Sequence, residues 1–196
     1  MYSFALQTPI GLLFVSVTER GLRRLHTLAG QPTIDAPALS EVPGPRPRAT
    51  AAEEAIAGAV EQQIAQYFEG SRRDFDLPLD LDRGSAFQRR VWEVIARIPY
   101  GEVASYAEVA EAAGAPGAFR AAGTACGANP VAIVTPCHRV IASGNKLGGY
   151  GLGIENKVWL LRHEGIGATA ARPDARVLLP LSAGGEGAGR RGRVGV

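Results

Sequence analysis

The sequence predicts an α+β protein in which a small unit of strands and one helix precedes a mostly helical unit. Short apolar runs near the N-terminus, separated by Pro and Gly, indicate strands. A helical apolar period follows from about Ala51. Two helix-start signatures come next, Ser85 with Gln88 and Ser105 with Glu108. Strands first and helices later are typical of the α+β class.

The first unit is placed at 1–83. Its three expected strands lie at 4–7, 12–17 and 22–28. Prolines recur between Pro32 and Arg48, so we predict a long surface loop at 32–48. The helix that follows ends at Gly70, and its apolar positions recur at helical spacing: Ile56, Val60, Ile64 and Phe68.

Four aspartates close this unit, Asp74, Asp76, Asp80 and Asp82. They surround the apolar segment 77–79, and their spacing matches no ligand loop that would hold a cation. We interpret them as the solvated side of an interdomain linker.

The second unit, placed at 84–166, opens with a helix after Ser85. Its buried face is predicted to run to Pro99, with Trp92 also in the core, and consists of Phe87, Val91, Ile95 and Ile98. A final helix is expected from Ile154 to about Glu164. Its buried positions are predicted to be Ile154, Val158 and Leu161.

Two short helices lie between these. The first is expected from Tyr106 to Gly114, and the second, with Pro116 in its first turn, to about Gly127. Joined by a tight turn, they form a predicted helix-turn-helix. An αα-hairpin that serves only the core is the alternative, and these residues alone leave the two about even. The second helix has a surface of small residues from which Arg120 alone is long and charged.

The chemistry is expected in the stretch 133–141, where Cys137 and His138 are adjacent and Pro136 fixes the backbone before them. Apolar residues on both sides place the pair at the edge of a core. A thiol reacts as thiolate, and histidine is one of the few groups that accepts its proton near neutral pH. By itself, a Cys-His dipeptide is more often a buried cysteine beside a solvated histidine.

The surrounding residues favour the reactive interpretation. The segment 136–140, Pro-Cys-His-Arg-Val, follows Asn129-Pro130-Val131 and precedes Gly149-Tyr150-Gly151 and the helix segment 157–161. This pattern closely resembles the O6-alkylguanine-DNA alkyltransferases, or methylated-DNA-protein-cysteine methyltransferases, over roughly 85–165. The resemblance implies a ribonuclease-H-like N-terminal domain without its chemistry, and a C-terminal domain that binds DNA and carries the reaction.

The resemblance also implies roles for single residues. Cys137 is the nucleophile, His138 takes its proton through a water, and Glu164 orients and charges the histidine. Tyr106 donates a hydrogen bond to a purine ring nitrogen of the leaving guanine, and Asn129 is a hinge between the DNA-reading helix and the active-site strand, on which Cys137 is expected to lie. The pocket for the flipped base is implied at Val140, Tyr150 and Gly151.

The helix after Pro116 is implied to enter the DNA minor groove. Arg120 intercalates there, in place of the flipped nucleotide. The full set of implied DNA-binding residues is Tyr106, Ala118, Phe119, Arg120 and Ser143.

The implied reaction transfers an alkyl group from O6-alkylguanine, and also from O4-alkylthymine, in double-stranded DNA to Cys137. A thioether is not readily hydrolysed, so we expect one turnover per molecule. We expect no cofactor, because the cysteine is itself the acceptor. We further expect a monomer with no obligate protein partner.

Composition agrees with a soluble protein. The hydrophobic content is 46% and no apolar run reaches the length of a membrane span, so we expect no membrane contact and a cytoplasmic location, with Cys126 and Cys137 reduced. Two cysteines and three dispersed histidines make a structural metal unexpected. The net charge of +2 is low for a protein that binds DNA mainly through phosphates. The Gly-, Ala- and Arg-rich segment 167–196 is predicted to be a disordered tail.

Three other functions are possible. A helix-turn-helix module could bind DNA without chemistry, although Cys137 argues against this. A thiol hydrolase with a Cys-His-Glu triad would turn over repeatedly without DNA, but we find no oxyanion-hole signature. The alkylated cysteine could also feed a transcriptional response, but we find no activation segment.

Overall fold

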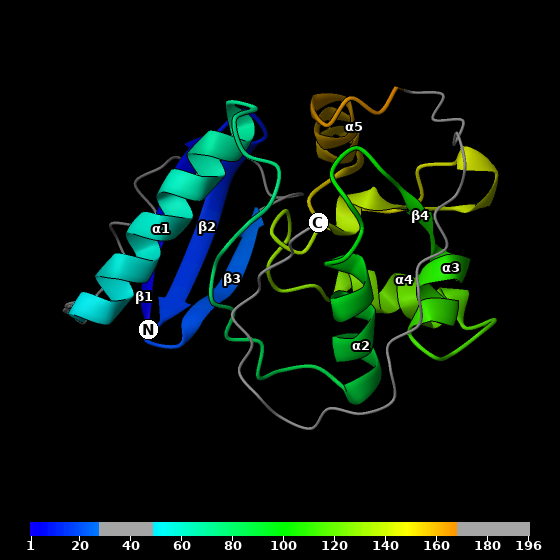
Figure 1. Ribbon diagram of the computed structural model, residues 1–196, viewed down its shortest axis with the longest axis horizontal. Coiled ribbons are helices and arrows are strands. Elements are labelled where there is room, and N and C mark those ends of the chain that lie inside the picture. The colour runs from blue at the N-terminus through cyan, green and yellow to red at the C-terminus, as the bar shows by residue number, and fades with distance from the viewer. Residues whose placement is uncertain (28–48, 168–196) are drawn as a thin grey trace.

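The computed structural model describes residues 1–27 and 49–167. The predicted loop at 32–48 and nearly all of the predicted tail lie outside these ranges. The N-terminal half is an antiparallel sheet in the order β1 (Tyr2–Thr8), β2 (Gly11–Thr18), β3 (Gly21–Thr27), with α1 (Ala51–Phe68) packed on one face (Figure 1). The third strand therefore begins one residue earlier than predicted.

The first core forms between β2 and α1. Alternate residues of β2 point inward and are buried: Leu13, Val15 and Val17. They pack with a stripe of α1 that includes Val60, Ile64 and Tyr67. The helix begins with a capping box, in which the Thr50 hydroxyl accepts from Glu53 N and the Glu53 carboxylate accepts from Thr50 N.

The outer edge of β3 joins the two halves. Leu22 N donates to Pro78 O at 2.8 Å, and Leu25 N donates to Pro130 O at 2.8 Å. The edge strand is thus covered by the linker at one end and by the segment before Cys137 at the other. The first core accordingly includes Val131 and Ile133 from the second half.

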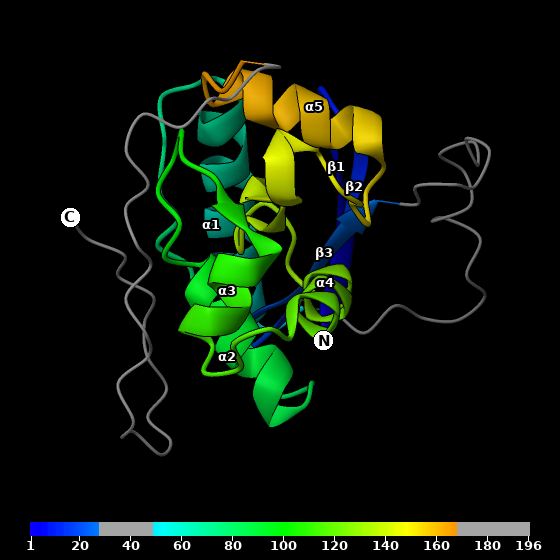
Figure 2. The ribbon, with the colours of Figure 1, turned by 90° about the vertical axis from the view of Figure 1, so that its right-hand side faces the viewer.

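The second half contains α2 (Ala86–Ile95), α3 (Tyr106–Ala112), α4 (Phe119–Gly127) and α5 (Ile154–His163). Both predicted capping boxes are present. The helices α3 and α4 pack against each other, with α5 lying apart from them (Figure 2). A short parallel pair, β4 (Ala104–Ser105) with β5 (Val140–Ile141), brings the start of α3 beside the cysteine segment.

Three details of the prediction were wrong. Pro116 lies in the turn before α4, which begins only at Phe119, because Gly117 adopts a φ of +81° that a helix does not allow. Ile154 is 44% exposed, while Lys157 is fully buried in α5. Asp80 is also buried, since it bonds Thr18, Arg20 and Arg23.

No helix in the described part of the chain is both long and apolar enough to cross a membrane.

Candidate active site

Cys137 lies in a 3₁₀ turn, η2 (Cys137–Arg139), rather than on the strand that the sequence predicted. A tight turn precedes it, in which Thr135 N donates to Val131 O at 2.9 Å. Ile133 in this turn has a φ of 74°, a strained conformation for a β-branched residue. The strand cannot form because this turn and Pro136, which lacks an N–H, interrupt the ladder. The thiol-bearing residue is 7% exposed, so it is shielded yet reachable.

Asn129 connects the end of α4 to the cysteine. Its side-chain nitrogen donates to Cys137 Sγ at 3.1 Å and to Thr135 O at 2.7 Å. Its side-chain oxygen accepts from Val131 N at 3.1 Å. The structure thus brings Asn129 into direct contact with the thiol. Because a donor to sulfur favours the anion, this hydrogen bond lowers the pKa of Cys137 against the larger opposing effect of burial, which leaves the pKa raised.

His138 and Glu164 form a buried pair. The distance from His138 Nε2 to Glu164 Oε1 is 2.8 Å, and the side chains of both residues are fully buried. An ionised carboxylate only accepts, so Nε2 carries the proton and Nδ1 is left as an acceptor. Nδ1 is buried and has no hydrogen-bond partner among the described residues. The imidazole is therefore arranged as a base with its lone pair unused.

Glu164 is held by several donors beside the histidine. Arg139 donates through Nε to Oε2 at 2.8 Å and through Nη2 to Oε1 at 2.9 Å. The Tyr67 hydroxyl, from α1, donates to Oε1 at 2.7 Å. Sequence reasoning missed both residues. Arg139 was visible only as part of the family pattern, and nothing in the α1 sequence distinguishes Tyr67 from an ordinary core aromatic.

These contacts determine the charge states. Burial by itself would raise the pKa of Glu164, but the hydrogen bonds and charges of His138 and Arg139 outweigh it and hold that pKa far below its ordinary range. Burial lowers the pKa of His138, although Glu164 opposes this. At neutral pH the resting site therefore holds a carboxylate, a neutral imidazole and a neutral thiol.

Lys157 is a further group that sequence reasoning missed. Its ammonium donates to Val140 O at 2.6 Å, Leu147 O at 2.5 Å and Gly149 O at 3.3 Å. Burial lowers its pKa to about 8, so it remains mostly charged near neutral pH. That charge acts to lower the pKa of Cys137. The available signals were its place in the family pattern at 157–161 and a helical position on the same face as Ile154 and Leu161.

Tyr106 is the first residue of α3 and lies against the glycine-rich segment. Its hydroxyl donates to Gly149 O at 3.3 Å. Gly148 allows this approach, since a Cβ there would lie 2.9 Å from the tyrosine ring. Burial, with smaller effects of Cys126 and Cys137, raises the pKa of Tyr106 to about 12. The phenol is therefore a protonated donor near the thiol.

The residues implied to hold the flipped base, Val140, Tyr150 and Gly151, have different surroundings. Tyr150 packs edge-on against the His138 ring at 6.3 Å between centroids, and its buried hydroxyl has no partner among residues 1–27 and 49–167. Val140 O already accepts from Lys157. Gly151 is exposed and lies beside Gly127 O, which a Cβ at this position would approach to 3.9 Å.

Of the implied DNA-binding residues, Phe119, Arg120 and Ser143 are exposed, whereas Tyr106 and Ala118 are partly buried. Phe119 and Arg120 are exposed at the start of α4, and the guanidinium lies over the Phe119 ring at 5.5 Å. Ala118 is the N-cap position of this helix and Ser143 is exposed in a second 3₁₀ turn, η3 (Ser143–Asn145). The exposed residues at the start of α4 are thus separate from the buried residues around Cys137. Asn129 lies between them, after the end of α4 and in contact with the thiol.

A helix-turn-helix beside a buried thiol, imidazole and carboxylate is typical of one class of protein, in which a cysteine accepts a group from a partner that binds to the helices. The chain belongs to the O6-methylguanine-DNA methyltransferase family. Residues 1–81 match the family model of the 6-O-methylguanine DNA methyltransferase ribonuclease-like domain, and residues 86–166 match that of the DNA-binding domain.

Similar proteins extend over different shares of the chain. A methylated-DNA-protein-cysteine methyltransferase of Mycolicibacterium paratuberculosis is 59% identical over 110 residues, or 56% of this chain and 66% of the relative, slightly under two thirds of its length. The protein of the same name from Methanosarcina barkeri is 39% identical over 164 residues, or 84% of this chain and 97% of the relative.

Solved structures agree in fold. The crystal structure of Mycobacterium tuberculosis O6-methylguanine methyltransferase superposes with a TM-score of 0.68 at 42% identity, over 88% of this chain and 96% of that one. A structure of the Mycobacterium tuberculosis protein in complex with DNA gives a TM-score of 0.67 at 43% identity, over 82% and 90% of the two chains. The predicted α+β fold with a ribonuclease-like N-terminal domain is confirmed.

Proposed function

We propose that this protein repairs DNA by transferring the alkyl group of O6-alkylguanine, and of O4-alkylthymine, to its own Cys137 in one irreversible step. The observation that carries the proposal is the Cys137 thiol, which accepts a hydrogen bond from Asn129 at 3.1 Å, next to a histidine whose buried Nδ1 has no hydrogen-bond partner in the described part of the chain. The family relatives named for this activity support it.

The thiol must lose its proton before or during attack. His138 Nδ1 accepts that proton, relayed by one water, and the ring becomes an imidazolium that Glu164 stabilises through the 2.8 Å contact. Asn129 and the charge of Lys157 stabilise the thiolate. Glu164, Asn129 and Lys157 act in the same direction, because each lowers the free energy of the pair of thiolate and imidazolium relative to the pair of neutral thiol and neutral imidazole.

The bond changes follow from this arrangement. Cys137 Sγ attacks the saturated carbon of the alkyl group, forming a C–S bond while the C–O6 bond breaks and its electron pair goes to the purine. Tyr106 donates a hydrogen bond to a ring nitrogen, so the guanine does not leave as an unassisted anion. The flipped base lies between Tyr150 and the backbone at Val140 and Gly151. No described residue is placed to cleave the thioether, so the protein acts once.

DNA is the partner in this proposal. The helix α4 enters the minor groove, with Ala118 and Phe119 at its start, and Ser143 contacts the backbone. All of these groups come from one chain, so a monomer suffices.

The experiment is the intact mass of the protein after incubation with a duplex that carries one O6-methylguanine. We expect a gain of one methyl group per molecule and no further gain with excess duplex. Cys137→Ala should bind the duplex and gain nothing. Binding without mass gain in the wild type would instead support a non-catalytic DNA-binding protein, and repeated turnover would support a hydrolase.

Replacement of Arg120 tests the DNA-reading helix. Arg120→Ala should weaken duplex binding by about 10-fold, because a guanidinium over a ring contributes on the order of 1–2 kcal/mol when it is removed from water. Arg73→Ala is the matched control: it removes an exposed arginine that lies over the Tyr100 ring at 5.4 Å, as Arg120 lies over Phe119. Equal affinities of the two variants, measured by fluorescence anisotropy, would mean that Arg120 is only a solvated charge.

A further inference from the structure

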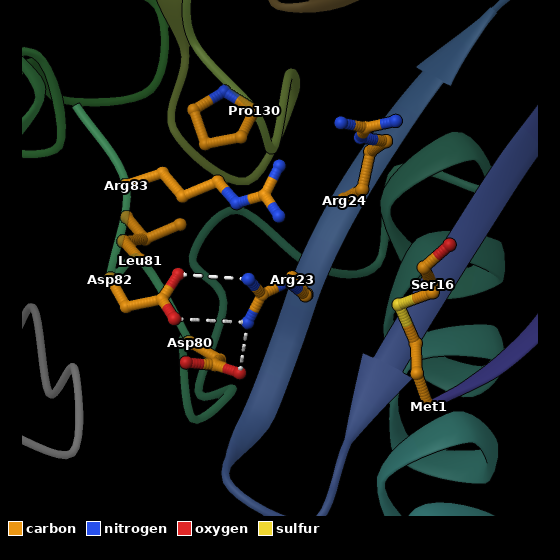
Figure 3. Close-up of a pocket in the computed structure, with 9 residues that line it drawn as sticks. All are labelled: Met1, Ser16, Arg23, Arg24, Asp80, Leu81, Asp82, Arg83 and Pro130. Carbon is orange, nitrogen blue, oxygen red and sulfur yellow. Dashed lines mark hydrogen bonds and ion pairs between the residues drawn. The ribbon is translucent and has the colours of Figure 1, made fainter.

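A pocket of about 210 Å³ lies away from Cys137, between β3 and the linker to the second half. Arg23 and Arg24 line it from the strand, Asp82 and Arg83 from the linker, and Pro130 closes one side (Figure 3). The hydrogen bonds of the β3 edge to both segments, including Leu25 N to Pro130 O at 2.8 Å, hold these walls together. The pocket is therefore part of the fixed junction between the halves.

The acidic charges beside this pocket are already paired. Asp80 bonds Arg20 at 2.7 Å and Arg23 at 3.0 Å. Asp82 bonds Arg23 at 3.0 Å and Arg20 at 3.3 Å. Two arginines thus balance two aspartates, and the pocket's remaining charge comes from Arg24 and Arg83.

Arg24 and Arg83 are exposed, and neither has an ion pair or hydrogen bond within the described ranges 1–27 and 49–167. Figure 3 shows the Arg83 side chain reaching from the linker towards β3, below Pro130, with Arg24 on that strand. Two like charges that line one open pocket are stabilised by an anion between them. Guanidinium groups match the oxygens of a phosphate in geometry as well as charge.

The pocket lies beyond the C-terminal end of α4. Along this helix the exposed face continues from Arg120 through Thr124 to Gly127 and Ala128, and the chain then reaches Pro130 at the pocket wall. At about 1.5 Å per helical residue, the helix spans roughly 10 Å from Arg120 to Gly127, and Pro130 lies three residues further along the chain. One DNA strand carries a phosphate every 3.4 Å or so along the axis, so this helical span alone is on the order of three phosphates.

We propose that Arg24 and Arg83 bind a backbone phosphate of the duplex on one side of the lesion, so that the N-terminal half contributes to DNA binding. The contact carries no sequence information, because a phosphate is common to every nucleotide. It also compensates for the low net charge of +2, by placing two free cations where the flank passes. The inference depends on DNA as the partner of the proposed function.

The test is the salt dependence of duplex binding by the double variant Arg24→Ala/Arg83→Ala. Loss of one phosphate contact should reduce the slope of log K against log salt by about 0.9. Arg162→Ala, which removes an exposed arginine of α5, should leave the slope unchanged. Each side of the duplex is then shortened in turn to about two base pairs from the lesion. The difference in slope between the wild type and the double variant should vanish only when the shortened side is the one that passes the pocket.

Three outcomes would overturn the inference. The first is an unchanged slope in the double variant, and the second is an equal loss of the slope difference on duplexes truncated at either side. The third is that inorganic phosphate protects the protein with Arg24 and Arg83, but not the double variant, against heat while the two slopes are the same. The last would indicate a site for a free anion. The duplex carries one O6-methylguanine, which fixes the register of its two sides, and every protein also carries Cys137→Ala, so the result is independent of alkyl transfer. A protein that accepts a methyl group but shows no slope difference contradicts this inference alone, and the reverse contradicts the transfer reaction alone.

Discussion

Glu164→Gln should slow alkyl transfer by at least about 100-fold, since positioned acid-base groups typically contribute 10²–10⁴. The carboxylate is fully buried and lies 2.8 Å from His138 Nε2. A neutral amide cannot stabilise the imidazolium that forms when the thiol gives up its proton. The rate is measured under single-turnover conditions from the intact mass at successive times.

Glu155→Gln is the control for this change, because Glu155 is an exposed glutamate at the start of the same helix. Its rate should equal that of the wild type. Duplex affinity is measured for each sample to show that the variant is folded. Glu164→Asp keeps the charge and should recover part of the rate. If Glu164→Gln reacts within a few-fold of the wild type, the carboxylate does not assist the histidine.

Arg139→Met should destabilise the protein by about 3–5 kcal/mol, which is typical when one member of a buried ion pair is removed. Arg139 makes two contacts to Glu164 and donates to Ile98 O at 2.6 Å. Methionine replaces the volume but leaves the carboxylate without its cation. The free energy of unfolding is obtained from urea titrations at pH 7, with Arg162→Met as an exposed control from α5.

The penalty of Arg139→Met should depend on pH. The pKa of Glu164 is lowered in the folded protein, so the stabilisation from its ionised form is present above the unfolded carboxyl pKa of about 4.3 and is lost as the pH falls below it. The difference between wild type and variant should therefore stay nearly constant from pH 7 to about pH 5 and shrink as the pH falls below about 4. A difference that stays constant below pH 4 as well would attribute the loss to packing instead of charge.

Local sequence patterns predicted most of the elements. Period-two and helical spacing located the strands, α1 and α2, and the capping boxes placed the helix starts at Ser85 and Ser105. Prediction failed where the backbone is irregular. The start of α4 depends on Gly117 at positive φ, and Cys137 lies in a 3₁₀ turn after the strained Ile133. Such conformations are imposed by tertiary contacts, which a periodicity does not contain.

The site was only partly accessible to sequence reasoning. A family pattern could nominate Cys137, His138 and Glu164, but not the buried charges that determine their protonation. Lys157 lies at a helical position that periodicity assigns to the core without distinguishing a charged residue. Asp80 was interpreted as solvated because its partners Arg20 and Arg23 are about 60 positions away in the chain, a separation that no local spacing rule covers.

The hydroxyl of Tyr67 reaches Glu164 at 2.7 Å across the junction of the two halves. The same tyrosine accepts, through its backbone carbonyl, from His163 Nε2 at 2.7 Å. The half that bears Cys137 is consequently not a self-sufficient module, since one hydrogen-bond donor to its Glu164 carboxylate lies 97 positions earlier in the chain. A chimera that takes its first half from a relative must therefore supply a hydrogen-bond donor to Glu164 at the position of Tyr67. Without that donor, the grafted half would fold normally while the reaction at Cys137 would be impaired.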